Sequence, residues 1–212
     1  MRAMESLRVC AAVATISLLG AGVAHATGAE VTRFKSNGAN ASHNSFDGKT
    51  AYDLGVSTNT QASSGTTTFL SFDTQTCASD FSVCSGIFGF GNIPNADFSV
   101  NGANATLNTN TNTNSNFTVF NYVQDNVNNT FTQTPAVGGI VAISWKKNQR
   151  ESTSFKGVST TVSGAFSNSF TGEQASDSAT ATGTLLSVPL PAMQSSFIGT
   201  MKSSQTIINR SK

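Results

Sequence analysis

The chain carries little charge. Asp, Glu, Lys and Arg make up 11% of its 212 residues, and the formal net charge is +1, whereas about a quarter of the residues is usual. A nearly neutral chain lacks the electrostatic footprint that nucleic acid requires, so nucleic acid is excluded as a partner. Low charge is also a feature of some low-complexity chains, but 15 Phe residues indicate a folded protein, since disordered chains are poor in aromatics.

Histidine and cysteine are scarce as well. Two His and three Cys do not supply a zinc ligand set, and we predict neither metal nor cofactor. A Ser-His-Asp hydrolase needs a histidine base, and His43 is the one candidate beyond residue 26. Ser42 and Asp47 are near it in sequence, but no G-x-S-x-G motif is present. We therefore interpret His43 as a solvated loop residue and predict no catalytic residues.

No apolar run reaches the roughly 20 residues that span a bilayer. The longest runs from Val9 to Ala24, follows Arg2 and Arg8, and ends in Ala24-His25-Ala26. This arrangement predicts a cleaved secretory signal peptide over residues 1–26 rather than a membrane anchor. The mature chain, 27–212, is expected to be a single β-rich domain without a membrane span, secreted into the periplasm or the extracellular space.

Cys10 leaves with the predicted signal, so Cys77 and Cys84 remain as a pair in an oxidising compartment. A redox-active or metal-binding pair is usually more closely spaced, as in C-x-x-C. We therefore predict a structural disulfide between Cys77 and Cys84 that clasps a hairpin.

Period-two alternation of apolar and polar residues dominates the rest of the chain. Asn37-Gly38, Asp47-Gly48 and Asn101-Gly102 are typical of tight hairpin turns. Short strands at close spacing predict an all-β antiparallel β-sandwich, jelly-roll-like or Greek-key, with a barrel as the alternative. One predicted face holds Val141, Ile143 and Trp145. Phe has no polar group, so we expect the Phe residues in the core rather than on a ligand platform.

The sequence LNTNTNTNSNF, residues 107–117, is the most unusual segment. In an extended chain its Thr and Asn residues occupy opposite faces. A candidate ligand surface therefore comprises Thr109, Thr111, Thr113, Asn108, Asn110 and Asn112. Because the repeat occurs once, the favoured interpretation is a polar connection between strands. The Asx-rich residues 125–130 lack the spacing of a calcium loop and are interpreted as a turn.

A basic cluster comprises Lys146, Lys147, Arg150 and Lys156. It suits contact with an anionic glycan, or charges that discourage pairing at a strand edge. Together these observations predict an exported, non-catalytic binding module for extracellular carbohydrate or matrix. The alternatives are a structural surface protein without a small ligand, and a glycoside-type hydrolase that uses Glu151 or Glu173 as a carboxylate.

Overall fold

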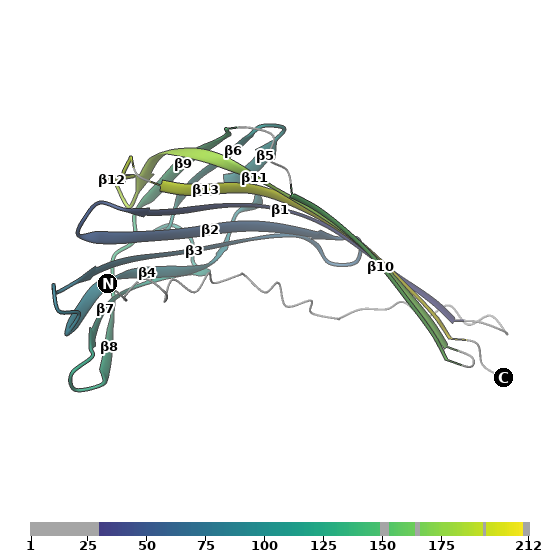
Figure 1. Ribbon diagram of the computed structural model, residues 1–212, viewed down its shortest axis with the longest axis horizontal. Coiled ribbons are helices and arrows are strands. Elements are labelled where there is room, and N and C mark those ends of the chain that lie inside the picture. Colours follow the sequence, from purple (N-terminus) through teal and green to yellow (C-terminus); the bar gives the residue numbers. More distant parts are fainter. Residues whose placement is uncertain (1–29, 149–152, 164–165, 193, 210–212) are drawn as a thin grey trace.

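The computed structural model describes residues 30–148, 153–163, 166–192 and 194–209 (Figure 1). The predicted signal peptide, 1–26, lies outside the described residues and stays a prediction. Within the described ranges the chain is almost entirely β-strand, with one 3-10 turn, η1, at Asn95–Asp97. None of the described helical segments is long and apolar enough to cross a membrane.

Several strands are longer than the short strands that the sequence pattern predicts, and the longest is β11. Their bounds are β1 Glu30–Phe46, β2 Thr50–Gln61, β3 Gly65–Cys77, β4 Val83–Ile93, β5 Phe98–Asn101, β6 Asn104–Asn110, β7 Phe117–Asp125, β8 Thr130–Pro135, β9 Ile140–Lys147, β10 Thr153–Ser163, β11 Phe166–Leu185, β12 Val188–Pro189 and β13 Gln194–Asn209.

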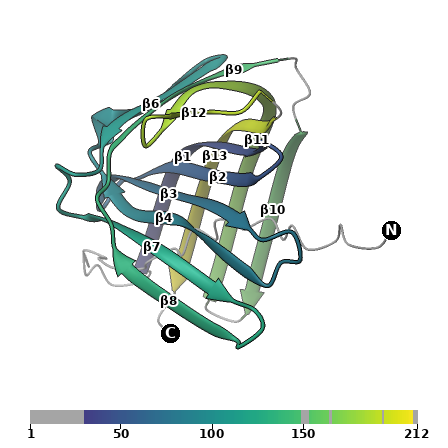
Figure 2. The ribbon, with the colours of Figure 1, turned by 90° about the vertical axis from the view of Figure 1, so that its left-hand side faces the viewer.

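All the strands belong to one hydrogen-bonded sheet with antiparallel pairing, which confirms the all-β antiparallel prediction. The order is β5-β6-β9-β11-β13-β1-β2-β3-β4-β7-β8, with β10 and β12 also paired to β11. The connections β4–β5, β6–β7 and β8–β9 are short, yet each joins strands from opposite ends of this order. The sheet therefore curls until its two ends approach each other (Figure 2), and the two layers of the sandwich are halves of one sheet.

The hydrophobic core fills the inside of the curl. Leu54, Leu70 and Ile198 have no exposed surface. Trp145 of β9 is also buried, and its indole N–H donates to the carbonyl of Ser42 on β1, 2.9 Å away. The predicted face of Val141, Ile143 and Trp145 is confirmed as part of this core.

Four strands continue past the core as a single layer, which we call the arm (Figure 1). The arm comprises residues 30–37 of β1, 202–209 of β13, 166–173 of β11, and β10. None of the described side chains in these ranges is buried. Both faces of the arm are therefore open to solvent, whereas most strands of the body have one face buried in the core.

Two of the three predicted turns are confirmed, and one is wrong. Asp47-Gly48 joins β1 to β2, and Asn101-Gly102 joins β5 to β6, with φ of 95° at Gly48 and 60° at Gly102. The third pair, residues 37–38, lies inside β1. There both residues pair with β13 on one side and β2 on the other. Two flanking ladders hold the backbone extended, so the local turn preference is overridden.

Candidate ligand-binding surface

The candidate site lies on the outer face of β3, β4, β7 and β8. On β3, Phe72 points into the core and is 3% exposed, so the next residue, Asp73, points outward. Residues opposite each other in register share a face of the sheet. Asp73 lies opposite Phe88 of β4, and Phe88 lies opposite Phe120 of β7. The outer face therefore brings a carboxylate and aromatic rings together.

Five aromatic side chains form a continuous cluster on this face, which we call the aromatic ridge: Phe88, Phe90, Phe120, Tyr122 and Phe131. The ring centroids of Phe88 and Phe120 are 5.2 Å apart, and those of Tyr122 and Phe131 are 5.8 Å apart. Phe88 and Tyr122, at 5.9 Å, join the two halves. These separations are within the range in which aromatic rings attract each other.

The two ends of the ridge are open, whereas its centre is covered. Phe90 is 45% exposed and Phe131 is 57% exposed, but Tyr122 is only 6% exposed. Phe90 pairs in register with Thr118 of β7, and Phe131 pairs with Gln124 of the same strand. Six residues of a strand span about 20 Å. A ligand that touches both open rings is therefore an extended molecule.

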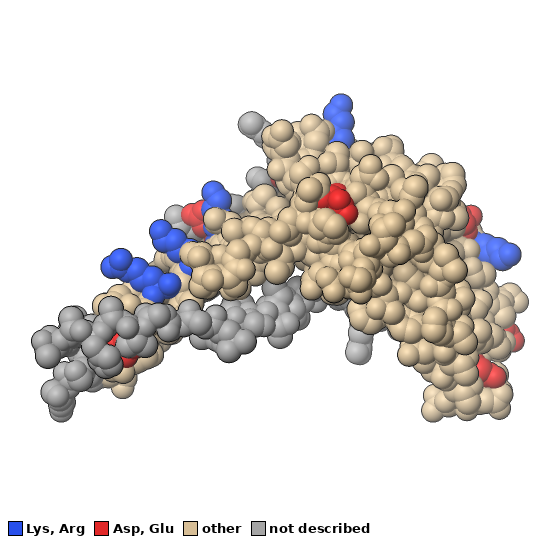
Figure 3. Space-filling model, turned by 180° about the vertical axis from the view of Figure 1, so that it is seen from behind, with Lys and Arg blue, Asp and Glu red and all other residues tan. Residues whose placement is uncertain are grey.

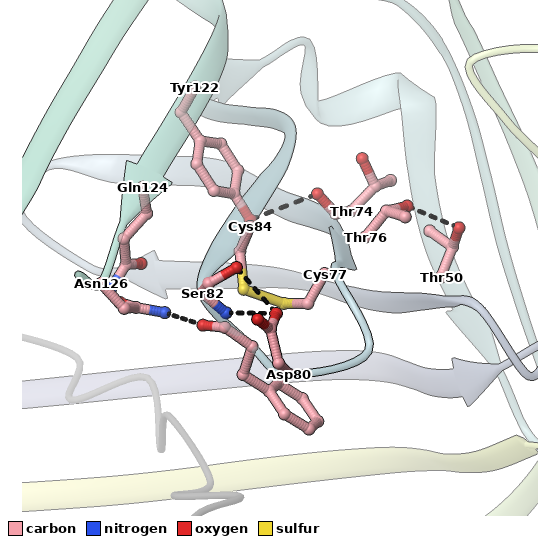
Figure 4. Close-up of a disulfide and its surroundings, with 11 residues drawn as sticks. Thr50, Thr74, Thr76, Cys77, Asp80, Ser82, Cys84, Tyr122, Gln124 and Asn126 are labelled. Carbon is pink, nitrogen blue, oxygen red and sulfur yellow. Dashed lines mark hydrogen bonds between the residues drawn. A yellow bond between two sulfur atoms is a disulfide. The ribbon is translucent and has the colours of Figure 1, made fainter.

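Gly86 provides the space in which the Tyr122 ring lies. A Cβ atom at position 86 would be 1.6 Å from the carbonyl oxygen of Thr74 and 2.9 Å from a Tyr122 ring carbon. The Tyr122 hydroxyl donates to that same carbonyl over 3.4 Å, as Figure 4 shows. Any side chain at position 86 would displace the ring, so this glycine positions the centre of the ridge.

Carboxylate and amide groups border the ridge on β1, β2 and β3. Asp53 lies opposite Asp73, and Asn44 lies opposite Asp53. The Asn44 side-chain amide donates to Asp53 Oδ2 over 2.9 Å. Asp73 Oδ1 is buried and has no hydrogen-bond partner among the described residues. Asp53 is exposed, so it is the carboxylate of this border that a ligand can reach beside the rings.

Desolvation raises the pKa of Asp73, and the nearby negative charge of Asp53 raises it further. Desolvation also raises the pKa of Asp53 itself. For Tyr122, desolvation comes first and the charge of Asp73 second, and both raise the pKa of the phenol. Tyr122 therefore keeps its proton at neutral pH and remains a hydrogen-bond donor.

Aromatic rings next to carboxylates and amides suit a ligand with both apolar C–H surfaces and hydroxyl groups. Comparisons with protein-family models, curated proteins and solved structures find no match to this chain.

The disulfide between Cys77 and Cys84 is present as predicted (Figure 4). The two residues lie opposite each other at the ends of β3 and β4. Between them, Asp80 Oδ1 accepts from the backbone N–H and the hydroxyl of Ser82. The Asn126 side chain donates to the carbonyl of Phe81 over 2.7 Å and ties this hairpin to the β7–β8 turn. The disulfide therefore fixes one end of the strands that carry the ridge.

The expectation that Phe residues belong to the core holds for three of them and fails for many others. Phe72, Phe98 and Phe117 are buried. The exposed ones are Phe46, Phe69, Phe81, Phe90, Phe131, Phe166, Phe170 and Phe197. Most of these lie on strands whose inner face is already filled by other residues, so the ring is left on the outer face.

The Asn/Thr segment is divided between core and surface. β6 continues to Asn110, so Thr109 and Thr111 point inward, and they are 3% and 4% exposed. The Thr111 hydroxyl exchanges two hydrogen bonds with the backbone of Gly139. Thr109 and Thr111 thus pack against the interior and are closed to a ligand. Asn108, Asn110, Asn112 and Thr113 are exposed, but none of them is part of the aromatic ridge.

His43 is not the solvated loop residue that the sequence suggested. It lies in β1 and is 1% exposed. Its Nδ1 is 3.1 Å from the Ser196 hydroxyl, and its Nε2 is 2.8 Å from the Ser45 hydroxyl. Desolvation lowers the pKa of His43. Asp47 is engaged elsewhere, because it accepts from the backbone of the β1–β2 turn and from Tyr52. These contacts do not assemble a triad.

The remaining acidic candidates are far apart or already engaged. Asp125 Oδ1 accepts from the backbone N–H groups of Val127 and Asn128, so the loop 125–130 is a self-bonded turn. Glu173 lies on the arm, opposite Lys202, and Glu151 lies outside the described residues. No group of three or more His, Cys, Asp or Glu side chains that suits a metal occurs among the described residues.

The predicted basic cluster is not one surface. Lys147, at the end of β9, forms an ion pair with Asp177. Lys156 is in β10, in register with Glu173 of β11. Lys147 pairs with Ala179 of β11. Ala179 is six residues along that strand from Glu173, so Lys147 and Lys156 are separated by about 20 Å in the strand direction. Arg150 lies outside the described residues.

Proposed function

We propose that this protein is a non-catalytic module that binds neutral polysaccharide through the aromatic ridge. The observation that supports this is the pair of open rings, Phe90 and Phe131, at the two ends of a covered aromatic centre. Apolar C–H faces of sugar rings pack on aromatic faces, and acceptors such as Asp53 and Asn44 suit the hydroxyls at the rim. An exposed apolar patch with a polar rim is typical of an interaction site.

Binding accounts for this surface better than hydrolysis. A glycosidase holds two carboxyl groups on either side of the scissile bond. Asp53 and Asp73 instead lie side by side on adjacent strands of an open sheet face. Glu173 is on the arm, remote from the ridge in the strand order.

The test is affinity electrophoresis in gels that contain soluble neutral polysaccharides such as xylan, hydroxyethyl cellulose and dextran. We expect retardation by at least one of them. Phe90→Ala and Phe131→Ala should each weaken binding about tenfold, since a stacked ring is worth about 1.4 kcal/mol, whereas Phe90→Tyr should retain most of it. The matched control is Phe197→Ala, because Phe197 is 43% exposed on β13, away from the ridge.

Two results would contradict the proposal. One is the absence of retardation in every neutral polysaccharide. The other is equal weakening by Phe90→Ala and Phe197→Ala, which would indicate general surface hydrophobicity. Far-UV circular dichroism of each variant separates loss of binding from loss of folding.

A structural surface role is the second candidate, and the edge strand β8 favours it. All six residues of β8 are exposed, and an open edge is a template for pairing with another chain. This role predicts concentration-dependent self-association that added polysaccharide does not change, measured by sedimentation velocity. A chain that stays monomeric while binding polysaccharide would remove this candidate.

Export is part of the proposal. The sequence of the first 26 residues and the disulfide both support it. N-terminal sequencing of the protein from its host should find Thr27 as the first residue. A retained Met1 together with reduced Cys77 and Cys84 would refute it.

A further inference from the structure

The arm presents two faces of different chemistry. Ala41 of β1 points into the core, and residues two positions apart share a face. Arg33 and Lys35 therefore lie on the continuation of the core-facing side. Phe34, between them, lies on the opposite face, which Phe170 and Met201 share by register. One face of the arm thus carries the cations together with smaller apolar residues such as Val31, and the other carries the larger apolar side chains Phe34, Phe170 and Met201.

A third cation extends the cationic face onto the neighbouring strand. Lys202 of β13 lies opposite Asn37 of β1 and is therefore a diagonal neighbour of Lys35. The Cα atoms of Arg33 and Lys35 are about 6.7 Å apart along the strand. Those of Lys35 and Lys202 are about 7–8 Å apart. We call these three residues the basic strip. Figure 3 shows Lys and Arg side chains in a row along the arm.

Hydroxyl groups lie among these cations. Thr206 is opposite Arg33, and Ser204 is opposite Lys35. The Ser204 hydroxyl is 2.6 Å from that of Thr171 on β11. One carboxylate shares the face, Glu173 opposite Lys202, so the described charges of this face sum to a net positive value. Hydroxyl donors between cations suit oxyanion groups.

Edge protection explains only part of this arrangement. Charges of either sign on either face would discourage pairing at the free edge of β1. Here all three charged residues are positive, and all three lie on the same face of the arm. Lys202 lies on β13, between β1 and β11, where it protects no edge. The strip therefore has the features of a binding surface.

We propose that the basic strip binds an anionic polysaccharide, with its sulfate or carboxylate groups on Arg33, Lys35 and Lys202. The inference does not depend on the aromatic ridge, which lies on the other face of the sheet. A polysaccharide fits better than nucleic acid because the described side chains of this face include no aromatic ring on which a base could stack.

The test compares dextran sulfate with uncharged dextran as probes on the full mature chain. Dextran sulfate should bind with an affinity that falls as salt is raised, because exposed charges are screened. Arg33→Gln/Lys35→Gln should weaken binding at least tenfold, and Lys202→Gln alone should weaken it severalfold. The matched control is Lys49→Gln/Lys146→Gln, which removes the same charge from exposed positions on the body and should change affinity less than twofold.

Equal weakening by the two double variants would overturn the proposal, because it would show a response to net charge alone. Equal binding of duplex DNA and dextran sulfate would also overturn it, as would tight binding of uncharged dextran at this strip. Phe90→Ala should leave dextran sulfate binding unchanged, so failure of the ridge and failure of the strip are separate outcomes. Trp145 fluorescence reports whether each variant retains its core.

Discussion

Breaking the disulfide gives the sharpest test of how this fold is stabilised. Cys77 and Cys84 are seven positions apart, so the bond closes a loop of about eight residues. On the chain-entropy account, a loop of this size removes about 8 cal/mol/K from the unfolded ensemble, or about 2.5 kcal/mol at 25 °C. The native hairpin already holds the two residues opposite each other. Cleavage should therefore lower the free energy of unfolding by about that amount.

Guanidinium chloride unfolding followed by Trp145 fluorescence measures this effect, since the single Trp is 1% exposed. With a denaturant dependence of about 4 kcal/mol/M, the midpoint should fall by about 0.6 M. Two routes should agree: the native chain in excess reductant, and Cys77→Ala/Cys84→Ala. Agreement would exclude an effect of the new side chains.

A midpoint change below about 0.1 M would refute the loop-closure reasoning, because the constraint would then be absent from the unfolded state. A changed slope with an unchanged midpoint would indicate a more compact unfolded ensemble instead. Either result would indicate that the disulfide holds the β3–β4 hairpin in place beside the ridge and does not stabilise the whole fold.

Further predictions concern the core and two buried ionisable groups. Leu54→Ala should cost about 2–5 kcal/mol in the same assay, whereas Val158→Ala, at a position 66% exposed on the arm, should change stability by no more than about 0.5 kcal/mol. Desolvation lowers the pKa of His43 below its ordinary value of 6.5. The stabilisation from the neutral, buried imidazole should therefore be complete above pH 6.5, and the free energy of unfolding should fall as the pH drops toward the folded-state pKa. His43→Gln should flatten that part of the profile of stability against pH. Because burial raises the pKa of Asp73, the ionised form is disfavoured in the fold, so Asp73→Asn should stabilise the protein at pH 7 and have no effect at a pH below 3.8, measured by thermal unfolding.

Much of the fold follows from alternation alone. The strand through Val141 and Trp145, the Asn101-Gly102 hairpin and the disulfide are all readable from the sequence, because each depends on local pattern. The lengths of β1 and β13 are not readable in this way. Their polar stretches, such as residues 42–45, form strands because ladders on both sides supply hydrogen bonds, which is a long-range effect.

The aromatic ridge illustrates a different difficulty. Phe88-Gly89-Phe90-Gly91 alternates clearly, but alternation does not say which face is inside. A Cβ at Gly89 would be 2.5 Å from the Phe72 ring, so Phe72 already fills the space on the inner side. The Gly face of β4 is therefore the packed one, and the Phe face is outside. The chain has many more Phe than Tyr or Trp residues. Because Phe usually indicates a core position, the sequence alone does not reveal this surface.

The two proposed surfaces have a joint consequence. The ridge lies on the outer face of β4, β7 and β8, whereas the basic strip lies on the core-facing side of the arm strands, so a polymer bound at one surface does not cover the other. Neither surface needs high affinity, because a long polymer offers many copies of its repeating unit and many chains bind along it. A protein with one neutral and one anionic site would then link two kinds of polymer. Such a division would account for the position of Arg33, Lys35 and Lys202 on one face of the arm, whereas Lys49 and Lys146 are dispersed over the body.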